Sequence, residues 1–389
     1  MNILKDRKFK LGDLIEEKIL KKSSSDNELI TFVGMEDVSE DGKLINQNVM
    51  KFSELKNGLT YFERKDVLVA KITPCFENSK GACLDNLKTE KGYGSTEFHV
   101  LRSNSKSIPR YIYYITQLKR FRKQLEGQMI GTAGHRRVPM EAIKNFTLEI
   151  LHPLPEQKAI AKVLSDVDEL IESIEKLIHK KKQIKQGAMQ ELLTGKKRLP
   201  GFSGEWEVKR LGELVTIASG ESPSKFRMKA DGIPYYKVEQ LNNCNKYQIT
   251  TPYYIECKNP IKSGSIVFPK RGAAILLNKV RILSRESYID TNLMALTPTD
   301  ELYNEYLFYF LIKKELWRIA DTTSVPQINN KHIKPLPIPL PPLPEQKAIA
   351  QILSDMDAEI EALEKKLDKY RKIKEGMMEK LLTGQVRLV

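Results

Sequence analysis

Two polar segments in the second half of the chain carry side chains suited to binding a nucleic acid. Residues 268–272 read FPKRG and residues 278–281 read NKVR. Lysine and arginine suit phosphate contacts, and arginine can also donate two hydrogen bonds to guanine, as asparagine can pair with adenine. The candidate residues for contacting DNA are Lys270, Arg271, Asn278, Lys279 and Arg281. Residues 71–81, KITPCFENSKG, lie at the matching place in the first half, with candidates Lys71, Thr73, Asn78 and Lys80.

A second pair of polar segments lies further along each half. Residues 131–138 read GTAGHRRV and residues 322–332 read TTSVPQINNKH. Both are rich in hydrogen-bond donors and lack an apolar stripe. Any one of these segments could be an ordinary solvated loop, but their recurrence at equivalent places in both halves favours loops that face DNA. The candidates are Thr132, His135, Arg136 and Arg137 in the first half, and Ser324, Gln327, Asn329, Asn330 and Lys331 in the second.

Catalytic and metal-binding motifs are missing from the sequence. It contains no GxxxxGKS or GxxxxGKT phosphate loop, no GxGxxG turn opening a helix after a strand, no HExxH and no GxSxG. The Asn/Asp-Pro-Pro-Tyr/Phe segment with which amino-methyltransferases hold their target group is also absent. The five histidines and four cysteines show neither ligand spacing nor a CxxC pair. We therefore expect no catalytic residue, no metal site and no cofactor in this chain.

Composition and charge limit the class of protein. A length of 389 residues favours two or more domains, and 41% hydrophobic residues are typical of a folded protein. The N-terminus lacks the apolar stretch of a signal peptide and no segment is apolar enough to span a membrane, so we expect a cytoplasmic protein. The net charge of +14 includes +6 in residues 1–153 and +5 in residues 200–342. This excess suits binding to a phosphate backbone, although proteins that touch no nucleic acid can carry a similar one.

The elements that must position these loops come from an internal duplication. Residues 154–199 and 343–388 align without a gap at an offset of 189 residues, with 27 of 46 positions identical. Each copy begins LPEQKAIA and ends LLTG followed by Arg-Leu three residues on. This period is far longer than that of a solenoid repeat, so it indicates two whole domains, each followed by the same helix.

Apolar residues step by three and four along both copies, as in the seam of a coiled coil. A proline and a glutamate near the start suit a helix N-terminus, and Thr-Gly suits its end. We expect the two helices to pair antiparallel within the chain; the alternative is that each packs on its own domain. Gly187 and Gly376 share one repeat position, where we expect a partner subunit or the facing helix to approach the backbone. The seam residues are Leu164, Val167, Ile171, Ile174 and Ile178 in the first copy, and Leu353, Met356, Ile360, Leu363 and Leu367 in the second.

The remaining sequence predicts two mixed α/β domains. Short apolar runs at residues 66–70, 98–101, 265–268 and 273–277 read as strands, and residues 110–125 and 301–319 read as amphipathic helices. The expected organisation is a globular domain at residues 1–153, a helix at 154–199, a second domain at 200–342 and a second helix at 343–389.

With these features the chain resembles the specificity subunit of a type I restriction-modification enzyme. The duplicated LPEQKAIA…LSD…LLTG…RL helices carry the resemblance, together with their proline-rich lead-ins and the segments 72–81 and 268–272. The resemblance implies two target recognition domains that each read half of a bipartite DNA site. It also implies partners: two methyltransferase subunits that use S-adenosylmethionine to methylate adenine N6, and motor-nuclease subunits that use ATP and Mg²⁺. A scaffold that binds nucleic acid without reading its sequence is the alternative, and a self-sufficient nuclease or methyltransferase would need the catalytic set that is missing.

Overall fold

The computed structural model describes residues 9–132, 134–321 and 325–388. The chain forms two compact units, one made of Met1–Glu175 with Lys366–Val389 and the other of Lys176–Lys365. The expected mixed α/β fold with two long helices is confirmed. The helices are α1 (Pro109–Gln117), α2 (Lys119–Glu126), α3 (Met140–Lys144), α4 (Leu154–Leu192), α5 (Leu211–Leu214), α6 (Asn304–Lys314), α7 (Asn330–Ile333) and α8 (Leu343–Leu382).

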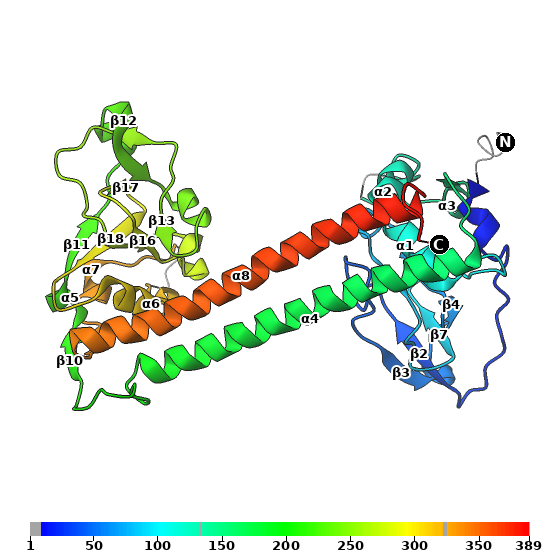
Figure 1. Ribbon diagram of the computed structural model, residues 1–389, viewed down its shortest axis with the longest axis horizontal. Helices are drawn as coiled ribbons and strands as arrows, with labels where there is room; N and C mark the ends of the chain where they lie inside the picture. The colour runs from blue at the N-terminus through cyan, green and yellow to red at the C-terminus, as the bar shows by residue number, and fades with distance from the viewer. Residues whose placement is uncertain (1–8, 133, 322–324, 389) are drawn as a thin grey trace. The chain divides into compact units, whose positions relative to one another are not determined.

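The first unit combines small sheets with helices (Figure 1). The sheets have the strand orders β1-β9, β3-β2-β7-β4 and β6-β5-β8, and all neighbours are antiparallel except β2 and β7. Buried residues of β5 and β8 pack against α1, where Tyr111 and Tyr114 are fully buried. The strands are β1 (Phe9–Lys10), β2 (Leu29–Val33), β3 (Asn48–Lys51), β4 (Thr60–Glu63), β5 (Val67–Ala70), β6 (Gly81–Cys83), β7 (Lys91–Gly94), β8 (Phe98–Leu101) and β9 (Thr147–Leu148).

The second unit has a larger central sheet of order β11-β18-β15-β16-β13, with smaller sheets β10-β19 and β14-β12-β17. Its core lies between β15, β18 and α6, where Tyr306 and Tyr309 are fully buried. The strands are β10 (Glu207–Arg210), β11 (Val215–Ser219), β12 (Met228–Tyr236), β13 (Tyr247–Gln248), β14 (Tyr254–Ile255), β15 (Ile266–Pro269), β16 (Arg281–Leu283), β17 (Tyr288–Ile289), β18 (Leu293–Pro298) and β19 (Pro337–Leu340).

Both long helices contribute to both units. In the first unit, Ile160 and Leu164 of α4 join the same core as Met378 and Leu382 of α8, and the two helix ends lie beside α1 and α2 (Figure 1). In the second unit, the end of α4 and the start of α8 share the other core. The end of α4 thus belongs to the core of the second unit, and the end of α8 belongs to the core of the first. The alternative that each helix packs only on its own domain is therefore wrong.

The apolar seam is buried along most of its length. Six of its residues are at most 7% exposed: Leu164, Ile171, Ile174, Ile178, Leu353 and Ile360. Leu367 is also buried, whereas Val167, Met356 and Leu363 are half-buried. Ion pairs flank the seam inside each unit, Lys374 to Asp168 at 2.6 Å and Arg371 to Glu175 at 2.7 Å in the first, and Lys181 to Glu359 and Lys182 to Glu364, each at 2.6 Å, in the second. In both units these pairs connect helices that run in opposite directions.

The identical start of the two repeats is explained by its partners at the end of the opposite repeat. Glu345 is fully buried and accepts from Nε and Nη2 of Arg198, both at 2.7 Å, and from Trp206 Nε1 at 3.0 Å. In the first unit, fully buried Glu156 accepts in the same way from Arg387, with Nε at 2.6 Å, and this hydrogen bond lowers the pKa of the Glu156 carboxyl. Each glutamate of LPEQ thus neutralises the arginine that ends the opposite repeat.

The glutamine that follows each of these glutamates is also fixed. Gln346 donates to the carbonyls of Glu301 and Pro341 and accepts from the Tyr303 N–H. Gln157 makes the same three kinds of hydrogen bond in the first unit. Because a buried amide needs its hydrogen bonds satisfied, this pattern locks the start of each helix to its unit.

Two local predictions were wrong. Residues 273–277 form a 3-10 turn and not a strand, between Gly272 with φ 81° and Asn278 with φ 45°. The two long amphipathic stretches are broken helices: Leu118 is extended between α1 and α2, and Glu315 has φ 55° after α6. Periodicity predicts the apolar face of these stretches but carries no signal for a single residue outside helical geometry.

Candidate nucleic-acid interface

In the first unit, the two polar loops lie side by side. The Thr73 N–H donates to the carbonyl of Arg136 at 2.9 Å, and the Val138 N–H donates to the carbonyl of Lys71 at 2.9 Å. Ile72 and Ile130 each form a β-bridge with Arg137. The candidate residues of both loops therefore belong to one surface, although they are separated by about sixty positions in the sequence.

The second unit repeats this arrangement. The Gly272 N–H donates to the carbonyl of Pro326 at 2.9 Å, and the Ile328 N–H donates to the carbonyl of Lys270 at 2.8 Å. Arg271 and Asp321 each form a β-bridge with Gln327. Backbone pairing thus makes Arg137 and Gln327 structurally equivalent, as it does Ile72 and Arg271. The frame of the two loop pairs is shared while the side chains differ.

Carboxylates hold several cations of the first unit. Arg137 binds Glu97 through Nε and Nη2 at 2.9 and 2.8 Å, and this contact raises the pKa of Arg137 and lowers that of Glu97. Arg136 Nη2 and the Thr73 hydroxyl both reach Oε1 of Glu77. The loops therefore present oriented, partly neutralised groups.

The other candidates of the first unit are exposed or held at the edges of the loops. Asn78 donates to Glu40 and Lys80 donates to the carbonyl of Met35. Thr132 and His135 are exposed, and Lys71 is half-buried. Arg122 is a residue that the sequence did not single out. Its buried guanidinium donates to the carbonyls of Thr116 and Phe76 and so anchors the loop from inside.

In the second unit, Arg271 is exposed beside half-buried Lys270, whose pKa is lowered by burial. Lys331 forms an ion pair with Asp321 at 3.2 Å, and Lys279 donates to Asn242. Asn329 and Asn330 are exposed, and Gln327 is half-buried. Ser324 lies outside the described residues.

Two candidates of this unit have structural surroundings that the sequence did not indicate. The amide of Asn278 donates to the Ile312 carbonyl at 2.8 Å and accepts from the Leu316 N–H at 3.2 Å, so it ties the 3-10 turn to the end of α6. Arg281 is half-buried, donates to its neighbour's carbonyl, and its pKa is lowered by burial. Asn278 is therefore better suited to shaping the loop than to reading a base.

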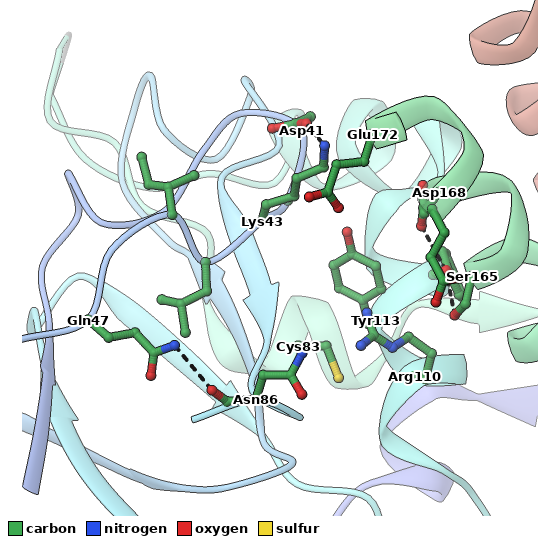
Figure 2. A pocket seen from close by; sticks show the side chains of 15 residues that line it. Asp41, Lys43, Gln47, Cys83, Asn86, Arg110, Tyr113, Ser165, Asp168 and Glu172 are labelled. Carbon is green, nitrogen blue, oxygen red and sulfur yellow. Dashed lines mark hydrogen bonds and ion pairs between the residues drawn. The ribbon is translucent and has the colours of Figure 1, made fainter. Parts of the chain in front are cut away.

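The first unit also contains a polar cavity of about 530 Å³ near the start of α4, lined by Asp41, Lys43, Arg110, Tyr113 and Asp168 among others. Figure 2 shows its charged side chains. Asp168 accepts from Tyr114 and pairs with Lys374, and Arg110 pairs with Asp85. Because these charged side chains pair with other residues of the unit, we assign the cavity a structural role. Among the described residues, no group of His, Cys, Asp and Glu could hold a metal ion.

We expect Arg271→Ala to weaken binding to one half of the recognised DNA only. The contact contributes about 1–3 kcal/mol if it is a bidentate hydrogen bond to a base. Competition binding with DNA changed in one half-site at a time measures the effect. Arg281→Ala is the comparison, because its guanidinium is less exposed. Equal weakening on every sequence would assign Arg271 to a phosphate, and unchanged binding would remove it from the interface.

Comparison with known families decides the identity. The family described as the type I restriction modification DNA specificity domain matches twice, over residues 6–186 and 203–370. The chain belongs to this family. Its function is sequence-specific DNA recognition in a type I restriction-modification system, where the specificity subunit is the recognition component and not the catalytic one. Among the described residues, no helix is long and apolar enough to cross a membrane.

Curated relatives agree with this family, and solved structures share the fold. The MjaVIII specificity subunit of Methanocaldococcus jannaschii is 30% identical over 302 residues, which cover 72% of this chain and 70% of the relative. The EcoAI specificity subunit of Escherichia coli is 40% identical over 140 residues, 35% of this chain and 23% of the relative. A type I restriction-modification S subunit from M. genitalium has a TM-score of 0.57 at 17% identity, covering 98% of this chain and 97% of that one. A chain solved in a study of complex assembly in the type I R-M system has a TM-score of 0.61 at 20% identity and covers 98% of both chains.

Proposed function

We propose that this specificity subunit reads a bipartite, asymmetric DNA sequence, one half with residues 1–153 and the other with residues 200–342. The observation that carries the proposal is the recurrence of one loop pair, built by the same backbone hydrogen bonds, in both units. Equivalent positions hold different side chains, Arg137 against Gln327 and Ile72 against Arg271. Since base readout depends on side-chain type, two domains built in this way should read two different sequences.

The repeated segments 154–199 and 343–389 are proposed to pair as an antiparallel coiled coil that sets the spacing of the half-sites. The buried seam and the ion pairs flanking it in each unit support this pairing. The same segments are the proposed docking surface for two methyltransferase subunits that methylate adenine N6 with S-adenosylmethionine. Motor-nuclease subunits that use ATP and Mg²⁺ would complete the assembly, which acts on double-stranded DNA in the cytoplasm.

Two similar cavities support a stoichiometry of two methyltransferase subunits. One, of about 1050 Å³, lies in the first unit and is lined by Asp168, Ile171, Lys374 and Met378. The other, of about 840 Å³, lies in the second unit and is lined by the residues at the matching repeat positions, Asp357, Ile360, Lys185 and Met189. Equivalent surfaces on the two units would bind two copies of one partner in equivalent ways.

The paired glycines test this docking surface. A methyl group added at Gly187 or Gly376 would meet no atom within 4 Å, so the facing helix does not approach the backbone there. That part of the prediction was wrong, and a partner subunit remains the proposed neighbour. Replacing both glycines by Leu should abolish co-purification with the methyltransferase subunit. The double Ala variant is the control, because it favours each helix by about 1 kcal/mol and adds little bulk. A Leu variant that still assembles would exclude this site.

The experiment that tests the proposed function is DNA binding by the subunit assembled with its methyltransferase at rising salt. Attraction to the phosphate backbone falls steeply with salt, whereas specific readout keeps a preference for one sequence. We expect selection from random duplexes at raised salt to yield two short conserved blocks separated by unread bases. Binding that is equally strong on all sequences would favour the scaffold alternative.

A further inference from the structure

Arg137 is held in a way that leaves one edge of its guanidinium free. Its Nε donates to Oε2 of Glu97 at 2.9 Å and its Nη2 donates to Oε1 at 2.8 Å, so the side edge is occupied by the carboxylate. Its Nη1 donates to the carbonyl of His135 at 3.3 Å. A guanidinium carries five N–H groups. The contacts to Glu97 and His135 use three of them, so Nη1 and Nη2 each keep one further N–H that no described residue is shown to bind.

This remaining edge has the form that reads guanine. Two parallel N–H groups from arginine match the O6 and N7 acceptors of guanine in the major groove. The Arg137 side chain is 45% exposed, and its backbone is fixed by β-bridges to Ile72 and Ile130. An exposed ion pair adds little to stability, so the bidentate Glu97 contact is better explained by the orientation that it imposes.

We infer that Arg137 reads a guanine in the half-site of the first domain, and that Glu97 is the positioning residue that aims it. This inference rests on the proposed function and deepens it, because it assigns one base to one residue. Without Glu97 the guanidinium would gain a second free edge and rotamer freedom, which suits phosphates as well as bases. The equivalent residue of the second domain, Gln327, suits adenine, so this position would read different bases in the two halves.

The test uses the full-length chain assembled with its methyltransferase subunits, on duplexes in which each base pair of the wild-type recognition sequence is replaced in turn. Arg137→Lys keeps the charge but loses the two-pronged edge, so discrimination at one guanine of the first half-site should fall by about 5- to 150-fold. Reading of the second half-site should not change, which shows that the variant is folded.

Glu97→Gln should lower the same discrimination, tighten binding to unrelated DNA, and steepen its salt dependence by about one released ion. In an Arg137→Lys background, the Glu97→Gln change should have no further effect on discrimination. Glu90→Gln is the matched control, because Glu90 pairs with Arg64 in the same domain but outside the loops.

Uniform weakening of all sequences by Arg137→Lys would assign the residue to a phosphate and overturn the inference. If Arg137→Lys left discrimination unchanged at every position, the inference would also be overturned. The proposed function would stand in that case, provided that the wild-type complex still preferred a bipartite sequence. A wild-type complex without any sequence preference would instead contradict the proposed function itself.

Discussion

Replacing Glu345 by Ala should destabilise the second unit by about 3 kcal/mol. Glu345 is fully buried and neutralises Arg198, and removing one partner of a buried ion pair leaves the other uncompensated, at a cost of about 3–5 kcal/mol. We expect the lower end of this range of free energies, because the Arg198 side chain is 24% exposed and can reach water. Guanidinium unfolding followed by tryptophan fluorescence measures the loss, since both tryptophans, Trp206 and Trp317, belong to this unit.

The control for this prediction is Glu315→Ala, which removes an exposed ion pair with Arg318 in the same unit. Exposed pairs contribute about 0–1 kcal/mol, so stability should hardly change. Glu156→Ala should destabilise the first unit in the same way through Arg387, but by less, because the Arg387 side chain is 47% exposed; circular dichroism measures this loss. If the buried and exposed variants proved equally stable, the buried ion pairs between the two repeats would not stabilise the unit in which each lies.

Lengthening both long helices should change the spacing of the recognised half-sites without changing the bases read. Four residues inserted after Glu175 in α4 and four after Lys365 in α8 add about 6 Å and roughly one turn to each helix. These points lie between the two units, so the ion pairs and cores within each unit are kept. We expect methylation mapping to show one or two additional unread base pairs, at about 3.4 Å each.

Insertion into α4 alone is the comparison for this experiment. It shifts one side of the seam against the other, and we expect assembly to be lost. An active enzyme with both insertions and an unchanged spacer would mean that the methyltransferase subunits, and not these helices, position the recognition domains.

The sequence predicted the repeated helices but not the side-chain contacts that they make. The duplicated helices follow from the 189-residue offset, and the recurrence of the polar loops in both halves follows from the same duplication, but their pairing within each half was not predicted. Glu156 and Glu345 were assigned to the helix dipole, because nothing in a sequence connects them to an arginine at the end of the other repeat. Their burial and hydrogen bonds make the ion pair the larger effect.

The roles of the loop residues also depend on neighbours that the sequence does not reveal. Cations and amides could be selected by type, but Glu97 lies outside the polar segments, and Glu77, although inside one of them, is an acidic residue that did not suit contact with DNA. Asn278 was selected for its amide, yet a left-handed backbone and two hydrogen bonds to the end of α6 give it a structural task. Which side chain is free to meet DNA depends on its neighbours in space, and those are not adjacent in the sequence.

Methylome sequencing of cells that carry the complete system tests directly whether the two domains read the two halves of one site. We expect modified adenines in one bipartite motif whose two specific halves differ and are separated by a fixed number of unread bases. The Arg271→Ala variant should alter only the half read by the second domain. A continuous or palindromic motif, or an unchanged methylome after deletion of this subunit, would contradict the claim that its two domains read the two halves of the site.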